Sequence, residues 1–350
     1  MIDAYAHIIP PRCFARLETL LETWQPSERV RLYRSWLRED EVLGDLEARW
    51  RLLEQFPDYR QVLVFGVYPM EELGDPATAT ALSRDVNDEL AGLVADHPDR
   101  FAGFAAELAL NDVDAAVGEL ERAATELGAL GAQIHTNVHG VPLDDPRFEP
   151  LFAKAHELDR ALWLHPGRSV TTPDFPAEPE SRFGIWWSLG WPYETAVAMA
   201  RLVYAGYMER YPGLKIITHH GGGMIPHFSG RLDAIQTEDQ REVFEQVFQR
   251  PALDYFRMFY ADTGSSARRT GCARRSSSSG PTTCCSAPTC RSAVRRSSRT
   301  PWPTCARSAC PRKTSTRSSR ATPSGCSRVS SAAVRRTGPR RRRPRRRPRA

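Results

Sequence analysis

Hydrophobic positions follow two alternating patterns along the first 265 residues of the chain. Short continuous apolar runs, rich in β-branched residues, predict buried strands. Longer stretches with apolar residues at helical spacing lie between several of these runs, and Asp, Gly or Pro marks many of their ends. The predicted strands cover residues 2–9, 61–69, 101–110, 131–138, 161–167, 214–223 and 257–264. The predicted helices cover residues 82–98, 112–128, 145–159 and 194–213.

The alternation of strands and helices predicts an α/β fold in which helices wrap a parallel sheet. The seven predicted strands approach the eight of a (β/α)₈ TIM barrel, which needs about 250 residues. The alternative, an open doubly wound sheet, usually carries a glycine fingerprint after its first strand, and none follows residues 2–9. We therefore expect a barrel domain over residues 1–265 that lacks its eighth strand.

Charge and cysteine content divide the chain at one place. All 42 acidic residues lie within residues 1–262, whereas the 48 Lys and Arg divide equally between 1–265 and 266–350. The first segment therefore has a formal charge of −18 and the second of +24. Only Cys13 of the eight cysteines lies in the first segment, which favours a reducing cytoplasm. That segment shows no signal peptide and no apolar run of the roughly 20 residues that span a membrane.

Polar side chains follow several of the predicted strands, close to the turn where each strand ends. His7 precedes Ile-Ile-Pro-Pro, His165 precedes Pro-Gly, and Asp262 precedes Thr-Gly. His219 and His220 stand directly before three glycines. Because the carboxyl ends of barrel strands converge on one rim, we expect these side chains to meet. Their nitrogen and oxygen atoms suit a divalent ion such as zinc, and an open coordination position would hold water.

Each of these histidines has an ordinary alternative when it is taken singly. A lone histidine is more often a surface or satisfied core residue, and this holds for His165. The recurrence of His or Asp at strand ends is what favours a site. His135, within the strand 131–138, suits a substrate contact better than a metal ligand.

A long block over residues 186–233, WWSLGWPYETAVAMARLVYAGYMERYPGLKIITHHGGGMIPHFSGRLD, is the most specific part of the chain. Together with HPDRFAGFA, PLDDPRFEPLF and LWLHPGR, it resembles the amidohydrolase-related enzymes, in particular the aminocarboxymuconate semialdehyde decarboxylase-like group. The resemblance covers nearly all of residues 1–265. It implies a distorted TIM barrel with one divalent ion, usually zinc, with manganese as the alternative. It also implies a homodimer.

The resemblance further implies an activity and the residues that carry it. The reaction would be non-oxidative decarboxylation or hydrolysis of a small organic acid, by a metal-dependent carboxy-lyase or hydrolase. Its metal ligands would be His7, His165 and Asp262. Asp262 and His220 would handle protons, with His219 as the second choice after His220.

Two further positions are candidates for binding the substrate. Trp187, like Trp186, resembles a residue of the pocket wall. Arg168, shortly after His165, could pair with a substrate carboxylate, although an exposed loop arginine is the ordinary alternative.

Tyr5 departs from the family pattern, whose first strand reads Asp-x-His-x-His. Asp3, Tyr5 and His7 share one face of the predicted strand, so the phenol stands where a metal ligand belongs. A neutral phenol is a poor ligand, because its free pKa is about 10. Three possibilities follow: Tyr5 binds as a phenolate, the metal keeps three protein ligands, or metal binding is weak. We favour the second. A binuclear site would need a lysine on the fourth strand, and neither Lys154 nor Lys215 lies there.

Residues 266–350 have a composition that cannot form a packed core alone, and we expect them to be disordered. They contain no Asp, Glu, Leu, Ile, Phe, Tyr, Asn, Gln or His, and they end in RRRRPRRRPRA. A nucleic-acid-binding protein that acts through this basic segment is therefore an alternative function. The spacing of four cysteines in this segment only faintly suggests zinc, because the gap within each pair exceeds that of a usual knuckle.

A shift of reading frame explains this segment better than either function does. GC-rich codons chosen for SSSGPTTCCSAPTCR can, in the neighbouring frame, spell FFGPDHVLFGTDMP, which is similar to the eighth strand of the family. We infer a frameshift shortly after Asp262. The predicted product is then a poorly stable relative whose activity is impaired or lost, because the barrel would lack one wall.

Overall fold

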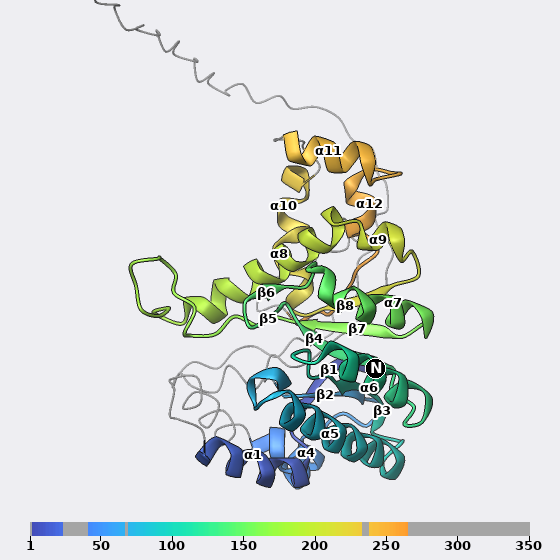
Figure 1. The fold of residues 1–350 in the computed structure, drawn as a ribbon. Helices are drawn as coiled ribbons and strands as arrows, with labels where there is room; N and C mark the ends of the chain where they lie inside the picture. Colours follow the sequence, from blue (N-terminus) through green and yellow to red (C-terminus); the bar gives the residue numbers. More distant parts are fainter. Residues whose placement is uncertain (1, 24–40, 67–68, 233–237, 265–350) are drawn as a thin grey trace, which may run out of the picture. The chain divides into compact units, whose positions relative to one another are not determined.

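A parallel sheet of seven strands forms the centre of the computed structural model, which describes residues 2–23, 41–66, 69–232 and 238–264 (Figure 1). The strand order is β1-β2-β3-β4-β7-β8-β9. These strands are β1 (Ile2–Ile8), β2 (Arg60–Phe65), β3 (Phe101–Glu107), β4 (Gly131–His135), β7 (Ala161–His165), β8 (Lys215–Thr218) and β9 (Tyr260–Ala261). A separate antiparallel pair joins β5 (Asn137–Val138) and β6 (Val141–Pro142).

Helices separate most of the strands, as the hydrophobic pattern predicts. The α-helices are α1 (Pro11–Thr23), α3 (Glu41–Gly44), α4 (Leu46–Leu53), α5 (Pro76–Asp96), α6 (Val113–Thr125), α7 (Glu149–Glu157), α8 (Trp191–Tyr204), α9 (Tyr207–Arg210), α10 (Ile225–Leu232), α11 (Glu238–Gln246) and α12 (Ala252–Phe256). Shorter turns are η1 (Met70–Glu72), η2 (Pro146–Phe148), η3 (Trp186–Gly190) and η4 (His220–Gly222). None of these helices is long and apolar enough to cross a membrane.

The predicted barrel architecture, without its eighth strand, is confirmed. Each strand of the main sheet pairs in parallel with the next one along the order, from β1–β2 through β8–β9. In the described part of the chain no strand pairs with the outer edge of β1 or of β9. The predicted tail 266–350, and with it the frameshift interpretation, lies outside the described residues.

Side chains alternate between the two faces of each strand, and this alternation produces two separate apolar clusters. The inner cluster, on the concave side of the sheet, contains Tyr5, Val62, Val64, Ala105 and Trp163. The outer cluster is much larger and packs the other face of the strands against the helices. The side chains at the strand ends that point into the barrel therefore lie on the same face of the sheet as the inner cluster.

Side-chain hydrogen bonds of two residues cross the interior of the barrel between β1 and strands that are not its neighbours. Nε1 of Trp163 on β7 donates to the carbonyl oxygen of Ala4 at 2.8 Å. The hydroxyl of Tyr5 lies 2.8 Å from the carbonyl oxygen of Ile217 and 3.1 Å from that of Leu164. These bonds connect β1 to β7 and β8, which fixes the curvature that the site needs.

Local signals set the helix boundaries where the sequence contains them. Asp112 caps α6 by accepting a hydrogen bond from the backbone N–H of Ala115, as its position before the predicted helix indicates. The single helix predicted for residues 194–213 is in fact two, α8 and α9. Gly206 separates them with a left-handed φ of 80°, a conformation that glycine adopts without steric cost.

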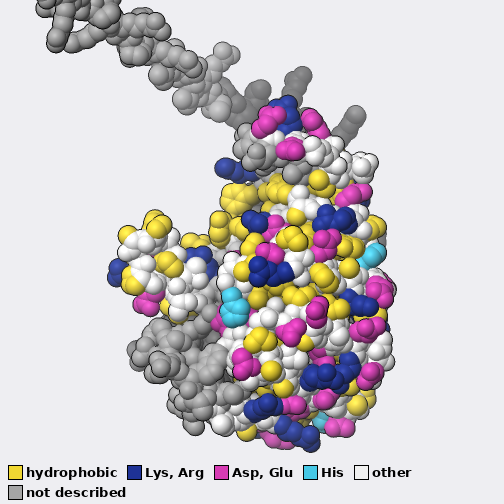
Figure 2. All heavy atoms as spheres, in the orientation of Figure 1, with side chains coloured by type: hydrophobic (Ala, Val, Ile, Leu, Met, Phe, Trp, Pro, Cys, Tyr) yellow, Lys and Arg dark blue, Asp and Glu magenta, His cyan; other side chains and the backbone are white. Residues whose placement is uncertain are grey.

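The surface of the described chain is mixed in charge on the face that Figure 2 shows, where acidic and basic side chains are interspersed. The segment between β7 and α8 is the exception, because it carries several exposed apolar side chains. Phe175, Phe183, Trp187 and Leu189 are 67%, 87%, 42% and 59% exposed.

Candidate metal centre

Three imidazoles converge at the carboxyl ends of strands that are far apart in the sequence. His7 lies near the end of β1, His165 ends β7, and His219 directly follows β8. Each offers one nitrogen such that the three nitrogens lie within 4.8 Å of one another. The ring centroids are 5.3 Å apart for His7 and His165, 5.6 Å for His7 and His219, and 5.2 Å for His165 and His219.

The hydrogen bonds of His7 and His165 leave one nitrogen of each ring available to an ion. Nδ1 of His7 donates to the carbonyl oxygen of Phe65 at 3.0 Å, and Nδ1 of His165 donates to that of Pro166 at 2.9 Å. A carbonyl oxygen can only accept a hydrogen bond, so these bonds place the ring proton on Nδ1. Nε2 is then unprotonated, and its lone pair can bind a metal ion. Both Nε2 atoms are buried without a hydrogen-bond partner in the described chain. The residues therefore fit a divalent metal ion.

Burial also keeps these imidazoles neutral, which metal binding requires. Burial, with the neighbouring His219 acting in the same direction, lowers the pKa of His7 to about 3. Burial likewise holds the pKa of His165 well below its usual range, with His219 and His7 acting in the same direction. Neither ring is protonated near neutral pH, so protons do not compete with a metal there.

Asp262 lies next to this cluster and is bound to one of its members. Its Oδ2 accepts a short hydrogen bond from Nδ1 of His219. Its Oδ1 accepts from the backbone N–H of Gly221 at 2.7 Å and from that of Gly264 at 3.1 Å. Burial alone would raise the pKa of Asp262, but His219 and these donors outweigh it and lower the pKa, so the group is a carboxylate.

The structure places Tyr5 beside the imidazoles but directs its hydroxyl elsewhere. The Tyr5 side chain is fully buried, and its ring stacks on that of His219 with centroids 4.2 Å apart and planes 14° apart. Its hydroxyl donates toward the carbonyl oxygens of Leu164 and Ile217. A group that donates to carbonyls keeps its proton, so this geometry argues against Tyr5 as a phenolate ligand.

His220 and Trp191 border the cluster on the side of α8. The His220 ring lies 4.0 Å from that of His219, and the Trp191 ring lies 5.3 Å from both His165 and His220. His220 has a left-handed φ of 53°, which is uncommon for a residue other than glycine and occurs often at functional sites. Its Nδ1 is buried without a hydrogen-bond partner among the described residues. Burial, helped by His219, lowers its pKa well below the usual range.

The three residues predicted to contact substrate lie in different surroundings. His135 is buried in register with His165, and their ring centroids are 5.4 Å apart. Trp187 is 42% exposed and its ring lies 6.3 Å from that of Trp191, at the edge of the cluster. The guanidinium of Arg168 is bound to its own loop, where it donates to the carbonyl oxygen of Pro173 at 2.9 Å and lies 3.6 Å from Asp174. Arg168 is thus not directed at the imidazoles.

Two residues of the cluster differ from those that the sequence favours. The sequence favours His220 over His219, whereas the ring nitrogen of His219 is the one within 4.8 Å of those of His7 and His165; the roles of both residues stay predictions. The alternation of side chains along β8 contains the missing signal, because Ile217 points into the barrel and a residue two positions later points the same way. Trp191 was not singled out, although Pro192 after it marks the start of a helix.

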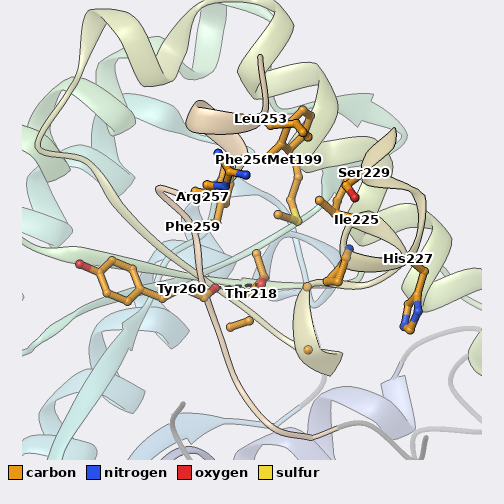
Figure 3. Close-up of a pocket in the computed structure, with 14 residues that line it drawn as sticks. Met199, Thr218, Ile225, His227, Ser229, Leu253, Phe256, Arg257, Phe259 and Tyr260 are labelled. Atoms are coloured by element: carbon orange, nitrogen blue, oxygen red, sulfur yellow. Dashed lines mark hydrogen bonds between the residues drawn. The ribbon is translucent and has the colours of Figure 1, made fainter. Parts of the chain in front are cut away.

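A cavity of about 420 Å³ is lined by none of the imidazoles of His7, His165 and His219, and Figure 3 shows residues that line it. It lies on the helix-covered side of β8 and β9, among residues of α8, α10 and α12 that include Met199, Ile225 and Phe256. Thr218 and Ala261 line it, whereas their chain neighbours His219 and Asp262 belong to the metal centre on the inner face. The cavity therefore adjoins the candidate site at the turn after His220, where Gly221 lines the cavity and its backbone N–H binds Asp262.

The fold and the site define a class: parallel α/β barrels with a polar site at the carboxyl ends of their strands. The amidohydrolase family model matches residues 2–261, and the chain belongs to this family. The resemblance noted in the sequence is thereby confirmed.

Curated relatives of the chain are decarboxylases. The chain is 34% identical over 158 residues to the 2-amino-3-carboxymuconate-6-semialdehyde decarboxylase of Dictyostelium discoideum, covering 45% of this chain and 42% of that protein. It is 35% identical over 207 residues to the gamma-resorcylate decarboxylase of Rhodococcus jostii, covering 55% of this chain and 60% of that protein. The chain thus spans less than two thirds of the length of either relative.

A solved structure agrees with these relatives. The dihydroxybenzoic acid decarboxylase of Polaromonas sp., solved with bound manganese and the inhibitor 2-nitroresorcinol, superimposes with a TM-score of 0.62 at 26% identity. The match covers 80% of this chain and 82% of that one. The two chains therefore share the same barrel over most of their length.

Proposed function

We propose that the chain is a metal-dependent decarboxylase that removes CO₂ from a small aromatic carboxylate without oxidation. The observation that carries the proposal is the convergence of His7, His165 and His219 on one point, with the Asp262 carboxylate behind them. The Nε2 atoms of His7 and His165 are buried without a hydrogen-bond partner among the described residues, which suits metal ligands. The names of the relatives supply the reaction type, and the names of the gamma-resorcylate and dihydroxybenzoic acid enzymes supply the aromatic substrate class.

In this proposal His7, His165 and His219 hold one divalent ion. A bound divalent ion would supply a positive charge that draws in and orients the anionic substrate. Asp262 was predicted as a direct ligand, but both of its oxygens are engaged by His219 and by backbone N–H groups. We propose that Asp262 acts through His219, whose ring orientation it fixes.

The reaction needs one proton at the ring carbon that loses CO₂. The carbon–carbon bond breaks, CO₂ leaves, and the electron pair that remains on the ring carbon takes up a proton. His220 is placed to carry that proton, because its Nδ1 is buried without a hydrogen-bond partner in the described chain and its ring lies beside the imidazole cluster. Because burial lowers the pKa of His220 well below its usual range, its ring is neutral at rest, and the proton that it passes to the ring carbon is taken from water.

The aromatic residue next to the cluster suits an aromatic substrate. Trp191 lies 5.3 Å from the His165 and His220 rings, and its Nε1 is occupied by a 2.8 Å hydrogen bond to the carbonyl oxygen of Arg168. That bond fixes the plane of the indole, so its apolar face can pack against a substrate ring. Hydrolysis, the other reaction that the sequence allows, has no such support.

Two observations favour different ions. The set of three nitrogen ligands favours zinc, as the sequence predicts. The related Polaromonas structure holds manganese, which supports manganese as the working ion of this subgroup. Elemental analysis of the purified full chain would decide between them. The cytoplasmic location and the homodimer stay predictions, and the nucleic-acid alternative depends on a segment outside the described residues.

The test uses the full chain with 2,6-dihydroxybenzoate as the probe and CO₂ release as the readout. We expect about one bound ion per chain and metal-dependent CO₂ release, both lost in His165→Ala. His227→Ala is the matched control, because this exposed histidine on α10 lies outside the cluster. A parent protein without bound ion and without CO₂ release after metal addition would reject the proposal.

A further inference from the structure

Tyr5 occupies a position on β1 that faces the metal centre, yet its functional atom contacts only the protein backbone. The hydroxyl lies 2.8 Å from the carbonyl oxygen of Ile217 and 3.1 Å from that of Leu164. Leu164 directly precedes His165, and Ile217 stands two residues before His219. One side chain of β1 therefore contacts the two strands that carry the other imidazoles.

The ring of Tyr5 makes a second contact with the same cluster. It stacks on His219 with centroids 4.2 Å apart and nearly parallel planes, on a side chain that is fully buried. His219 is thus held from two sides, by the aromatic face of Tyr5 and by Asp262 at Nδ1. Its ring has little freedom to rotate, since turning it would break the stack and the hydrogen bond together.

We propose that Tyr5 is a positioning residue, which binds no metal and instead holds the imidazoles of His165 and His219 at the spacing at which they and His7 bind one ion. The proposal rests on the metal centre proposed above. It accounts for a phenol at a place where a ligand is expected: the residue replaces a metal–ligand bond by hydrogen bonds across the barrel. It also means that the protein supplies three ligands rather than four.

The unpaired edge of β1 explains why hydrogen bonds from Tyr5 matter for the position of this strand. In the described chain β1 pairs only with β2, so its other edge has no strand that would fix its distance to β8 and β9. Hydrogen bonds of Tyr5 and Trp163 cross the barrel interior and connect β1 to the strands β7 and β8. Removing the Tyr5 hydroxyl should therefore change the distances between the imidazoles, whereas the stack of the Tyr5 ring on His219 should change less.

The decisive measurement on the unmodified full chain is its absorption spectrum after loading with iron(III). A phenolate bound to iron(III) gives an intense charge-transfer band in the visible range. We expect no such band, because Tyr5 keeps its proton. A band that disappears in Tyr5→Phe would show that Tyr5 is a ligand and would overturn the proposal, whether or not the variant is stable.

A second measurement compares Tyr5→Phe with Tyr255→Phe, which removes another hydroxyl from a fully buried side chain far from the imidazoles. We expect about tenfold weaker binding of cobalt(II) and a changed cobalt visible spectrum in Tyr5→Phe only, as for other residues that orient ligands. Unchanged affinity and spectrum would overturn the positioning role.

A metal-free measurement separates this inference from the proposed function. The ring-proton resonances of His165 and His219 should shift in metal-free Tyr5→Phe and stay unchanged in Tyr255→Phe. Unmoved resonances would refute the positioning role. If no ion binds to the parent protein while these resonances do move, the proposed enzyme function fails and the positioning of the imidazoles by Tyr5 stands.

Discussion

Nδ1 of His219 donates a short hydrogen bond to Oδ2 of Asp262, and this bond joins the ends of two neighbouring strands. His219 follows β8 and Asp262 follows β9, so the two residues are 43 positions apart in the sequence. The same carboxylate accepts the N–H of Gly221, which orders the turn after His219. Asp262 thus holds both the imidazole and the loop that carries it.

Replacing Asp262 by Asn should weaken metal binding without abolishing it. The amide can keep a hydrogen bond to His219 but removes the negative charge that strengthens this bond. We expect the affinity for zinc(II) or manganese(II) to fall about tenfold, as for other partners of ligating histidines. Calorimetric titration of the full chain measures this change.

The control for that variant is Asp254→Asn, which removes an exposed carboxylate that pairs with Arg257 on the outer side of the barrel. It should bind metal like the parent. If Asp262→Asn instead loses the ion as completely as His165→Ala, Asp262 is a direct ligand, as the sequence suggested.

The fold was predictable because its signals are local and repeated. Continuous apolar runs identified the seven strands, and the order of strands and helices left few parallel architectures. The break at Gly206 was missed because the apolar spacing continues through it, while the change of direction depends on one left-handed residue. The periodicity of apolar residues indicates which face of a helix is buried, but it does not indicate where the chain changes direction.

The site was only partly predictable, since side-chain direction is decided by tertiary contacts. His7 and His165 could be identified from their positions at strand ends. The alternation along β8 indicates that His219 points into the barrel, but no pattern of neighbouring residues indicates the left-handed φ of 53° at His220. The direction of Arg168 likewise depends on the fold of its own loop, whose carbonyls capture the guanidinium.

Arg168→Ala should therefore affect stability rather than substrate binding. The variant loses the hydrogen bond to Pro173 and the contact with Asp174, and we expect the free energy of unfolding to fall by about 1–2 kcal/mol. The KM for 2,6-dihydroxybenzoate should stay within about threefold of the parent value, because the Arg168 guanidinium does not contribute to substrate binding. Urea unfolding and initial rates measure the two effects.

Arg147→Ala is the matched control for Arg168, since Arg147 is exposed and pairs with Asp145 next to it. A KM that rises by about tenfold or more in Arg168→Ala alone would contradict the structure, because that loss equals a charge-assisted hydrogen bond to the substrate. The guanidinium would then have to leave its loop when substrate binds.

Glu107 should make the stability of the protein depend on pH. This buried carboxyl at the end of β3 accepts a 2.5 Å hydrogen bond from Nε2 of Gln133. Burial, and then the nearby Glu71, raise its pKa well above the usual range. A raised pKa in the folded state stabilises the protein fully below the unfolded pKa, and this contribution is lost as pH rises toward the folded value.

Glu107→Gln removes this titration, so the variant should gain on the parent as pH rises from about 5. The difference in the free energy of unfolding should change by about 1.4 kcal/mol per pH unit until the folded pKa is passed. Urea unfolding at several pH values measures it, with Glu121→Gln as a control whose side chain is 53% exposed. A constant difference between Glu107→Gln and the parent would show that Glu107 does not titrate differently in the folded state.

Trp163→Phe tests whether the bonds across the barrel interior hold the open sheet in shape. The variant keeps an aromatic ring in the inner cluster but loses the donor to the carbonyl oxygen of Ala4, which remains buried on β1. A buried acceptor without a donor costs about 1–3 kcal/mol, so the unfolding midpoint in urea should fall accordingly. Because β1 also carries His7, metal affinity should fall with stability.

The control is Trp50→Phe. Trp50 lies outside the inner cluster, and its indole packs on His97 and Phe101, so this variant should leave metal affinity unchanged. If Trp163→Phe lowers stability but not metal affinity, the position of β1 is set by its pairing with β2 alone.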